Sequence, residues 1–252
     1  MYNVSKHLER CVQSLKEQNY SNLEIIFVDD KSTDNSLELL KQLTADMPNV
    51  KIIEHETNQG LLKARLTGLL NCTGDYIHFL DSDDFVDIDF YASYIEKLNQ
   101  EKPDICFCRY HRVDKYMNPI ITMNNCKEFC VYGKNYECLT EVFNTQLYSA
   151  YHYMWTKIIS KELWEKSKQD LLEITKDAVH ILGGEESIFN IVFLSKAYKV
   201  TNCNGKKVSY CQHDDQSIKL TNFDKLMFQT KSIIRANTIA RNYAIQNNIY
   251  QL

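Results

Sequence analysis

Apolar residues follow two alternating patterns along the first half of the chain. Short continuous apolar runs, typical of buried strands, occur at 23–28, 50–54, 76–80 and 105–110. Between these runs, leucines and aromatic residues recur every three to four positions, which predicts amphipathic helices at 1–18, 37–46, 62–70 and 90–101. The alternation predicts an α/β fold, with a Rossmann-like, mainly parallel sheet and helices on both faces.

The start of the chain departs from this scheme. A fold of this kind should open with a strand from which the first helix crosses over. Here the helical pattern begins almost at Met1. We therefore expect the first strand to be missing from this reading frame, so that the sheet has a gap or is completed from elsewhere.

The second half of the chain carries a weaker pattern. Residues 114–134 are polar and are punctuated by Pro119 and Gly133, which predicts an irregular segment. Further helices are predicted at 136–143, at 162–172 and after Gly184, and further strands at 198–201 and 208–211.

The last segment, 223–250, has helical spacing and a mildly basic polar side, and it predicts a helical C-terminal appendage. Such a helix could dock on a membrane surface or on a second subunit, which would make a homodimer. We interpret the face that carries Ile233 and Ile234 as part of the intramolecular core instead.

Composition narrows the functional classes. Of the 252 residues, 44% are apolar and 25% are charged, which is enough for a sizeable core, and the net charge of −4 gives no sign of a nucleic-acid surface. The 9 Cys include no Cys-x-x-Cys pair, which favours reduced thiols in a cytoplasmic protein over a zinc site. We expect no signal peptide and no membrane span, because no apolar run approaches about 18 residues.

Carboxylates cluster where two of the predicted strands end. Asp29 and Asp30 follow one strand, and Asp81, Asp83 and Asp84 follow another. Parallel strands bring their carboxyl ends to one edge of a sheet, where ligands bind, so one pocket could hold both clusters. Adjacent carboxylates repel each other, and a hard divalent cation such as Mn²⁺ or Mg²⁺ would neutralise them. The alternative is a surface turn, since Asp and Ser are ordinary turn residues.

Three further sets of side chains are candidates, each with a structural alternative. Glu185 and Glu186 follow a glycine turn at a predicted helix start, where the dipole favours an ionised acid, although acids there also simply start helices well. Lys63 and Arg65 could pair with a diphosphate or with the aspartates. The alternative is that each is simply a charged side chain in solvent; this is the default interpretation for Lys63, but it is weaker for Arg65, which borders an apolar face. His213 could be a metal ligand or merely an exposed loop residue.

Aromatic residues around Trp155 could form a floor on which a sugar ring stacks, or they could belong to the core.

Three stretches resemble the family-two glycosyltransferases of the GT-A type in order and spacing. They read Asn-Leu-Glu-Ile-Ile-Phe-Val-Asp-Asp-Lys-Ser-Thr-Asp at 22–34, Asn-Gln-Gly-Leu-Leu-Lys-Ala-Arg at 58–65 and Gly-Asp-Tyr-Ile-His-Phe-Leu-Asp-Ser-Asp-Asp at 74–84. A weaker likeness continues through Met-Trp-Thr-Lys at 154–157 and beyond. Within the family, the chain is similar to bacterial surface-glycan (lipooligosaccharide) transferases.

The resemblance implies a role for each matching position. Asp30, with Asp29 beside it, would contact the uracil of a nucleotide sugar, and Lys63, Arg65, Asp81 and Ser82 would belong to the same donor site. Asp81 and Asp83 would form the Asp-x-Asp metal motif, completed by His213. Glu185 and Glu186 take the place of the catalytic acidic pair, which is usually Glu-Asp, so either could be the base. Trp155 and Lys157 would lie on the acceptor side.

The resemblance also implies an organisation and a reaction. Residues 1–110 would bind the nucleotide sugar, 111–220 the acceptor, and 221–252 would form the helical appendage. The implied activity is metal-dependent, inverting transfer of a hexose or N-acetylhexosamine from a UDP-sugar to a glycan or lipid-linked glycan, in the cytoplasm at the inner face of the membrane. Two alternatives remain open: an inactive or truncated nucleotide- or glycan-binding module, and a nucleotidyltransferase.

Overall fold

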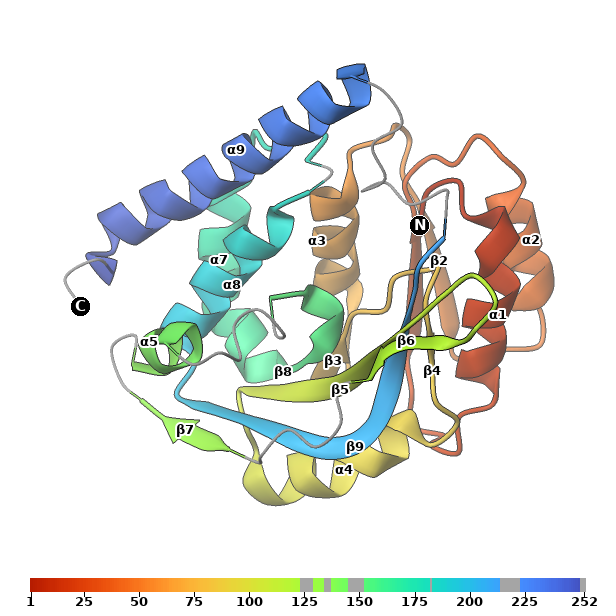
Figure 1. The fold of residues 1–252 in the computed structure, drawn as a ribbon, viewed down its shortest axis with the longest axis horizontal. Coiled ribbons are helices and arrows are strands. Elements are labelled where there is room, and N and C mark those ends of the chain that lie inside the picture. Colours follow the sequence, from red (N-terminus) through yellow and green to blue (C-terminus); the bar gives the residue numbers. More distant parts are fainter. Residues whose placement is uncertain (123–128, 134–136, 145–151, 182, 214–222, 250–252) are drawn as a thin grey trace.

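The protein is described by a computed structural model that covers residues 1–122, 129–133, 137–144, 152–181, 183–213 and 223–249 (Figure 1). The first half contains α1 (Ser5–Lys16), β1 (Ile25–Asp29), α2 (Ser36–Leu43), β2 (Val50–Glu54), α3 (Leu61–Asn71), β3 (Tyr76–His78), β4 (Phe85–Val86) and α4 (Phe90–Glu101). The second half contains β5 (Ile105–Val113), β6 (Pro119–Thr122), β7 (Cys130–Tyr132), α5 (Glu137–Asn144), β8 (Lys157–Ser160), α7 (Lys161–Ile174), α8 (Glu185–Lys196), β9 (Lys199–Cys211) and α9 (Phe223–Gln246).

The strands form two separate sheets among the described residues. β1 and β2 pair in parallel as a two-stranded sheet. The larger sheet has the order β3-β8-β5-β9-β4, with β6 paired to β5 and β7 to β9; β5 and β9 run parallel, and the other pairs are antiparallel. The expected gap therefore lies between β1 and β3, each of which ends its own sheet.

Helices cover both faces of the larger sheet, as the sequence predicts. Along β5, Ile105 and Phe107 point into a core shared with α3, α5, α7, α8 and α9. Cys106, Cys108 and Tyr110 alternate with them and point into a second core, shared with α1, α2 and α4. Alternate residues of a strand point to opposite faces, so burial on both faces explains why this strand is a continuous apolar run.

Three predictions about the elements are wrong. The first helix begins at Ser5 rather than near Met1. The segment 114–134, predicted to be irregular, supplies β6 and β7, which exist because they add to the edges of β5 and β9 and not because of their own pattern. The two strands predicted at 198–201 and 208–211 are the ends of one strand, β9.

The C-terminal helix α9 lies across α8, on the outside of the molecule (Figure 1). Its buried face carries Ala236, Ala240, Tyr243 and Ala244, whereas Ile233 and Ile234 are exposed. The interpretation of that isoleucine face as core is therefore wrong: small residues, not the isoleucines, let this helix approach its neighbours. No helix in the described part of the chain combines the length and apolar character needed to cross a bilayer. The division at 110 and 220 stays a prediction.

Candidate active site

A cavity of about 1170 Å³ opens between β1 and β3 and ends at the loop that follows β3. Its polar end is lined by Asp30, Arg65, Asp81, Asp83 and His213. These residues come from four segments of the chain that are far apart in sequence. The carboxyl ends of β1 and β3 therefore meet at one rim, as the predicted sheet requires.

Asp30 is held rigidly at the end of β1. Its carboxylate accepts hydrogen bonds from the backbone N–H groups of Gln59 (2.8 Å) and Gly60 (2.7 Å), where α3 begins, and His55 Nδ1 lies 2.7 Å away. Asp30 thus satisfies amide groups at the start of a helix, which have no partner within it. Gly60 is needed here because its φ is +91° and a Cβ would come within 2.9 Å of His180 Cα.

Asp29, the neighbour of Asp30, is also buried and turned inward. Its carboxylate accepts from the backbone N–H (3.1 Å) and the hydroxyl (2.5 Å) of Ser32. This bond shapes the turn after β1 and leaves Asp30 as the residue of the pair that lines the cavity.

Arg65 links the two halves of the site. From α3, its guanidinium donates to Glu185 Oε1 at 2.6 Å and to Asp81 Oδ1 at 3.0 Å, and Glu186 lies 3.9 Å away. Burial disfavours the charge, but Asp81 and Glu185 outweigh this cost and raise the pKa of Arg65. The prediction that Arg65 differs from a solvated helix charge agrees with its 6% exposure.

The two glutamates at the start of α8 have different surroundings. Glu185 is only 1% exposed, and its Oε2 is buried without a hydrogen-bond partner among the described residues. Burial, with Glu186 adding to it, raises the pKa of Glu185 to about 8 against the opposing effect of Arg65. The Glu186 side chain is 15% exposed. Neither lines the cavity directly among the described residues; Arg65 connects them to it.

The loop after β3 gathers further acids. His213 Nε2 lies 3.0 Å from Asp83 Oδ2, and Arg10 donates to the Asp83 carbonyl at 2.8 Å. Asp84 is fully buried and accepts from the backbone N–H of Cys211 at 2.8 Å, and burial raises its pKa well above the ordinary value. Burial, aided by Asp83, also raises the pKa of Asp81 despite Arg65. The acids therefore outnumber the cations at this rim.

The donor atoms at the rim suit a divalent cation. Carboxylate oxygens are ligands for both Mn²⁺ and Mg²⁺, whereas an imidazole nitrogen suits Mn²⁺ and not Mg²⁺, which prefers oxygen. The short Asp83–His213 contact shows that both side chains can reach one point. Among the described side chains, no set of three or more His, Cys, Asp or Glu already has metal-site spacing. The fit thus rests on Asp83 and His213, with Asp81 engaged by Arg65.

Besides Asp29, Glu185 and Glu186, which do not line the cavity, three more predicted site residues lie away from this rim. Lys63 Nζ donates to the carbonyl of Thr175 at 2.7 Å, on another face of α3. Lys157 is buried and donates to the carbonyl of Tyr153 at 2.6 Å, and burial lowers its pKa to about 7. Trp155 is also buried, in a stack with Tyr153 and Tyr210. For Trp155, the structure therefore agrees with the alternative that this residue belongs to the core.

Sequence reasoning missed two residues of the site. His55 directly follows the second strand of the parallel pair, so the rule that placed Asp29 and Asp30 at the rim could have placed it there too. Arg10 gives no such signal, because it comes from the polar side of α1 and only the packing of that helix brings it to Asp83.

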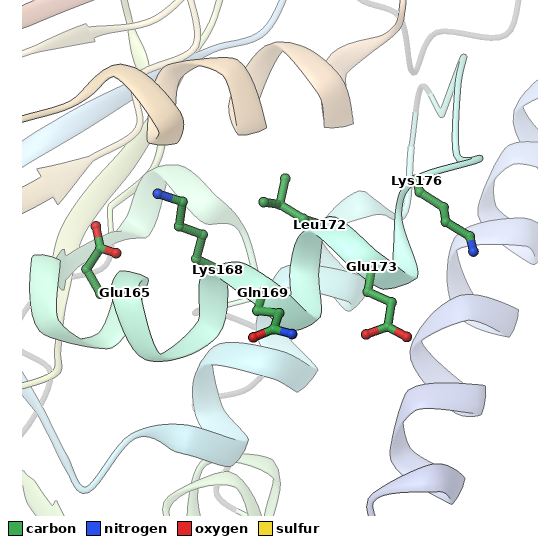
Figure 2. Close-up of a pocket in the computed structure, with 6 residues that line it drawn as sticks. All are labelled: Glu165, Lys168, Gln169, Leu172, Glu173 and Lys176. Carbon is green, nitrogen blue, oxygen red and sulfur yellow. The ribbon is translucent and has the colours of Figure 1, made fainter.

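A second hollow, of about 510 Å³, lies on α7 and the turn after it (Figure 2). Two glutamates and two lysines line it beside Gln169 and Leu172. The balanced charge and the absence of any candidate residue among these six side chains leave the rim between β1 and β3 as the candidate active site.

Comparison with known families supports the fold and its class. The family described as "Glycosyl transferase family 2" matches residues 1–158. Glycosyltransferase GlyA of Streptococcus pneumoniae is 30% identical over 70% of this chain, and the uncharacterized glycosyltransferase EpsJ of Bacillus subtilis is 29% identical over 79%. The chain spans only 26% of GlyA and 56% of EpsJ.

Solved structures give the same architecture. TarS of S. aureus, residues 1–349 in complex with UDP-GlcNAc, aligns with 93% of this chain and 64% of its own, with a TM-score of 0.68 and 18% identity. At this identity the likeness supports the fold alone, and it confirms the GT-A class that the sequence resemblance implies.

Proposed function

Because the chain belongs to glycosyl transferase family 2, we propose that it transfers a hexose or N-acetylhexosamine from a UDP-sugar to a surface-glycan acceptor, with inversion at the anomeric carbon. The observation that carries this proposal is the pair of bonds from Arg65 to Asp81 and Glu185. They unite the donor-side acids with the acidic pair at α8, which the reaction needs at one place.

The donor half of the proposal uses the cavity rim. Asp30 would receive the uracil end of the donor, and Asp83 with His213 would hold a divalent cation beside its diphosphate. Such a cation, when bound, neutralises charge that develops on the departing diphosphate. TarS was crystallised with UDP-GlcNAc and with UDP, which supports a uridine nucleotide as the first ligand to test.

The acceptor half of the proposal uses the acidic pair. A base must be able to contact the acceptor hydroxyl, and Glu186 is the more exposed of the two, whereas Glu185 is bound to Arg65. Glu186 would take the proton of the hydroxyl as its oxygen bonds to the anomeric carbon and the bond from that carbon to the diphosphate breaks. Glu185 would position Arg65.

The test is donor turnover in the presence of Mn²⁺, first as hydrolysis of a panel of UDP-sugars. We expect Glu186→Gln to lower turnover by about a hundredfold or more. Glu173→Gln, an exposed glutamate of the hollow on α7, is the matched control and should leave turnover unchanged. Full activity in Glu186→Gln would refute the assignment of Glu186 as the base.

Calorimetric titration separates this proposal from its alternatives. UDP binding with Mn²⁺ but without turnover of any UDP-sugar would favour a binding module. Formation of pyrophosphate from UTP and a sugar phosphate would favour a nucleotidyltransferase.

A further inference from the structure

The turn between α7 and α8 leads directly into the acidic pair, and it lies against α3 on one side. This turn, which comprises the described residues 175–181, 183 and 184, accepts a hydrogen bond from Lys63 of α3 at the Thr175 carbonyl (2.7 Å). Its His180 N–H donates to the carbonyl of Gln59, just before α3, at 2.8 Å. The start of α3 therefore supports the turn from the side of the rim.

The other side of the turn lies against the C-terminal helix α9, which crosses α8 on the outside of the molecule (Figure 1). The Arg235 guanidinium donates to the carbonyls of Asp177 and Val179. About one helical turn earlier on α9, the Ser232 hydroxyl donates to the Gly183 carbonyl at 3.4 Å. Side chains of one helix thus bind backbone carbonyls along the turn and hold it against α9.

The backbones of the turn and of α9 come very close at Gly184, the residue directly before the acidic pair. Gly184 has a φ of +81°, and a Cβ there would lie 3.2 Å from Ile233 Cα and 3.3 Å from Ala236 Cβ. Ala236 is fully buried, and only a side chain as small as its methyl group leaves room for this approach. The Gly184 carbonyl accepts from the Ser187 N–H at 3.0 Å in the first turn of α8. The first turn of α8 therefore rests on the backbone of α9.

This contact bears on the acidic pair because it is one of two supports for the start of α8. The other support is the hydrogen bond of 2.6 Å between Arg65 and Glu185. The carboxylate of Glu186 lies 3.9 Å from Arg65, so its place depends on the course of the helix that carries it. A displacement of a reacting group by about 1 Å can lower a rate about a hundredfold. A change in how α9 meets Gly184 should therefore alter the rate without touching the donor.

We propose that α9 is a positioning element of the active site and that Ala236 is its positioning residue. By letting α9 contact the backbone of Gly184, Ala236 sets the place of Glu186 relative to the rim between β1 and β3. This inference rests on the proposed function, in which Glu186 is the base. It gives a role in the reaction to a helix on the outside of the molecule, and it accounts for a small residue at the crossing with α8.

The test replaces Ala236 by Leu and measures kcat and KM for a UDP-sugar with Mn²⁺, together with calorimetric titration with UDP. The larger side chain must separate α9 from Gly184, so we expect Ala236→Leu to lower kcat by about tenfold or more. KM for the UDP-sugar and Kd for UDP should be unchanged, because Asp30 and Asp83 are carried by other elements. An unchanged kcat would overturn the proposal.

Ala244→Leu is the matched control for this variant. Ala244 is likewise buried on α9 but lies about 12 Å further along the helix than Ala236, away from Gly184. Both substitutions insert a larger side chain into a packed core, so both should lower Tm. Only Ala236→Leu should lower kcat per UDP-binding site, the concentration of which the titration gives. An equal fall of kcat in the two variants would mean that overpacking alone is responsible, and it would overturn the proposal.

Hydrogen exchange tests the contact independently of any turnover. In Ala236→Leu, the Ser187 amide should exchange about tenfold faster than in the wild type, because the first turn of α8 has lost its support. The Gly60 amide, which is bonded to Asp30, should keep its rate. Unchanged exchange at Ser187 would overturn the inference. If the wild type turned over no UDP-sugar, the proposed function would fail, and the exchange rates would still decide whether α9 supports the start of α8.

Discussion

Truncation of Arg65 is the strongest test of how this site is held together. Arg65 makes charge-assisted hydrogen bonds to Glu185 at 2.6 Å and to Asp81 at 3.0 Å, and all but 6% of its surface is buried. In Arg65→Met, the chain keeps an apolar side chain of similar length but loses both bonds. The side chain of Asp81 is 30% exposed, so water replaces most of what it loses.

The cost should therefore come mainly from Glu185, which is 1% exposed. Breaking one side of a buried ion pair typically costs about 3–5 kcal/mol, and we expect Arg65→Met to lower the free energy of unfolding by about 3 kcal/mol. The loss should be larger at pH 9 than at pH 6. Without Arg65, the raised pKa of Glu185 rises further, so the folded variant holds a proton that its unfolded chain has released.

Urea denaturation at both pH values measures this loss. Lys63→Met is the matched control on the same helix, because Lys63 donates only to carbonyls near the surface, and it should cost less than about 1 kcal/mol. Adding Glu185→Gln to Arg65→Met replaces a carboxyl group that must take up a proton on folding with a neutral amide, and it should restore much of the stability lost at pH 9. A loss below about 1 kcal/mol, or strictly additive effects of the two substitutions, would refute the reasoning.

Three further predictions test the surroundings of the site. Burial lowers the pKa of Lys157 to about 7, so between pH 7 and about 10 the unfolded chain binds more protons than the folded chain. In parallel urea titrations, the stability of the wild type should therefore rise with pH relative to that of Lys157→Met. Gly60→Ala should lower the free energy of unfolding by about 1–3 kcal/mol, and so lower Tm by several degrees, because Gly60 has a positive φ and a Cβ there would contact His180. An unchanged Tm would contradict this. Ser160→Ala removes the cap bond to Leu163 at the start of α7 and should cost about 1 kcal/mol in the same assay.

Local pattern predicted the elements that carry their own signal. The helix at 90–101 and the strand at 50–54 have the predicted bounds, because each presents its full apolar face within its own sequence. β6 and β7 could not be predicted in this way, since both are short and polar-flanked and take their structure from the strands beside them. The sequence pattern divides β9 in two because the polar stretch around Gly205, in the middle of the strand, interrupts the apolar run, although the backbone of Lys206 is held by bonds to α4.

The same distinction holds within the site. Asp30 and Asp83 each follow a strand that can be predicted from the sequence, and strand topology brings the ends of such strands together. The structure places both residues on one cavity. The different surroundings of Lys63 and Arg65 depend on which side of α3 meets α8, which no local pattern contains. The burial of Trp155 likewise depends on its stacking against Tyr210, which lies far away in sequence.

Helix geometry explains why two adjacent glutamates can have separate roles. Successive residues of an α-helix point about 100° apart, so only one of a neighbouring pair can be directed at a given partner. At the start of α8, Glu185 takes the inward direction and is bound by Arg65, which leaves Glu186 turned toward the more open side. A shorter Asp at the second position would present its carboxylate closer to the helix. The Glu-Glu pair of this chain therefore extends the second carboxylate by one methylene without altering the inward anchor, and under the proposed function this shifts where the acceptor hydroxyl must sit.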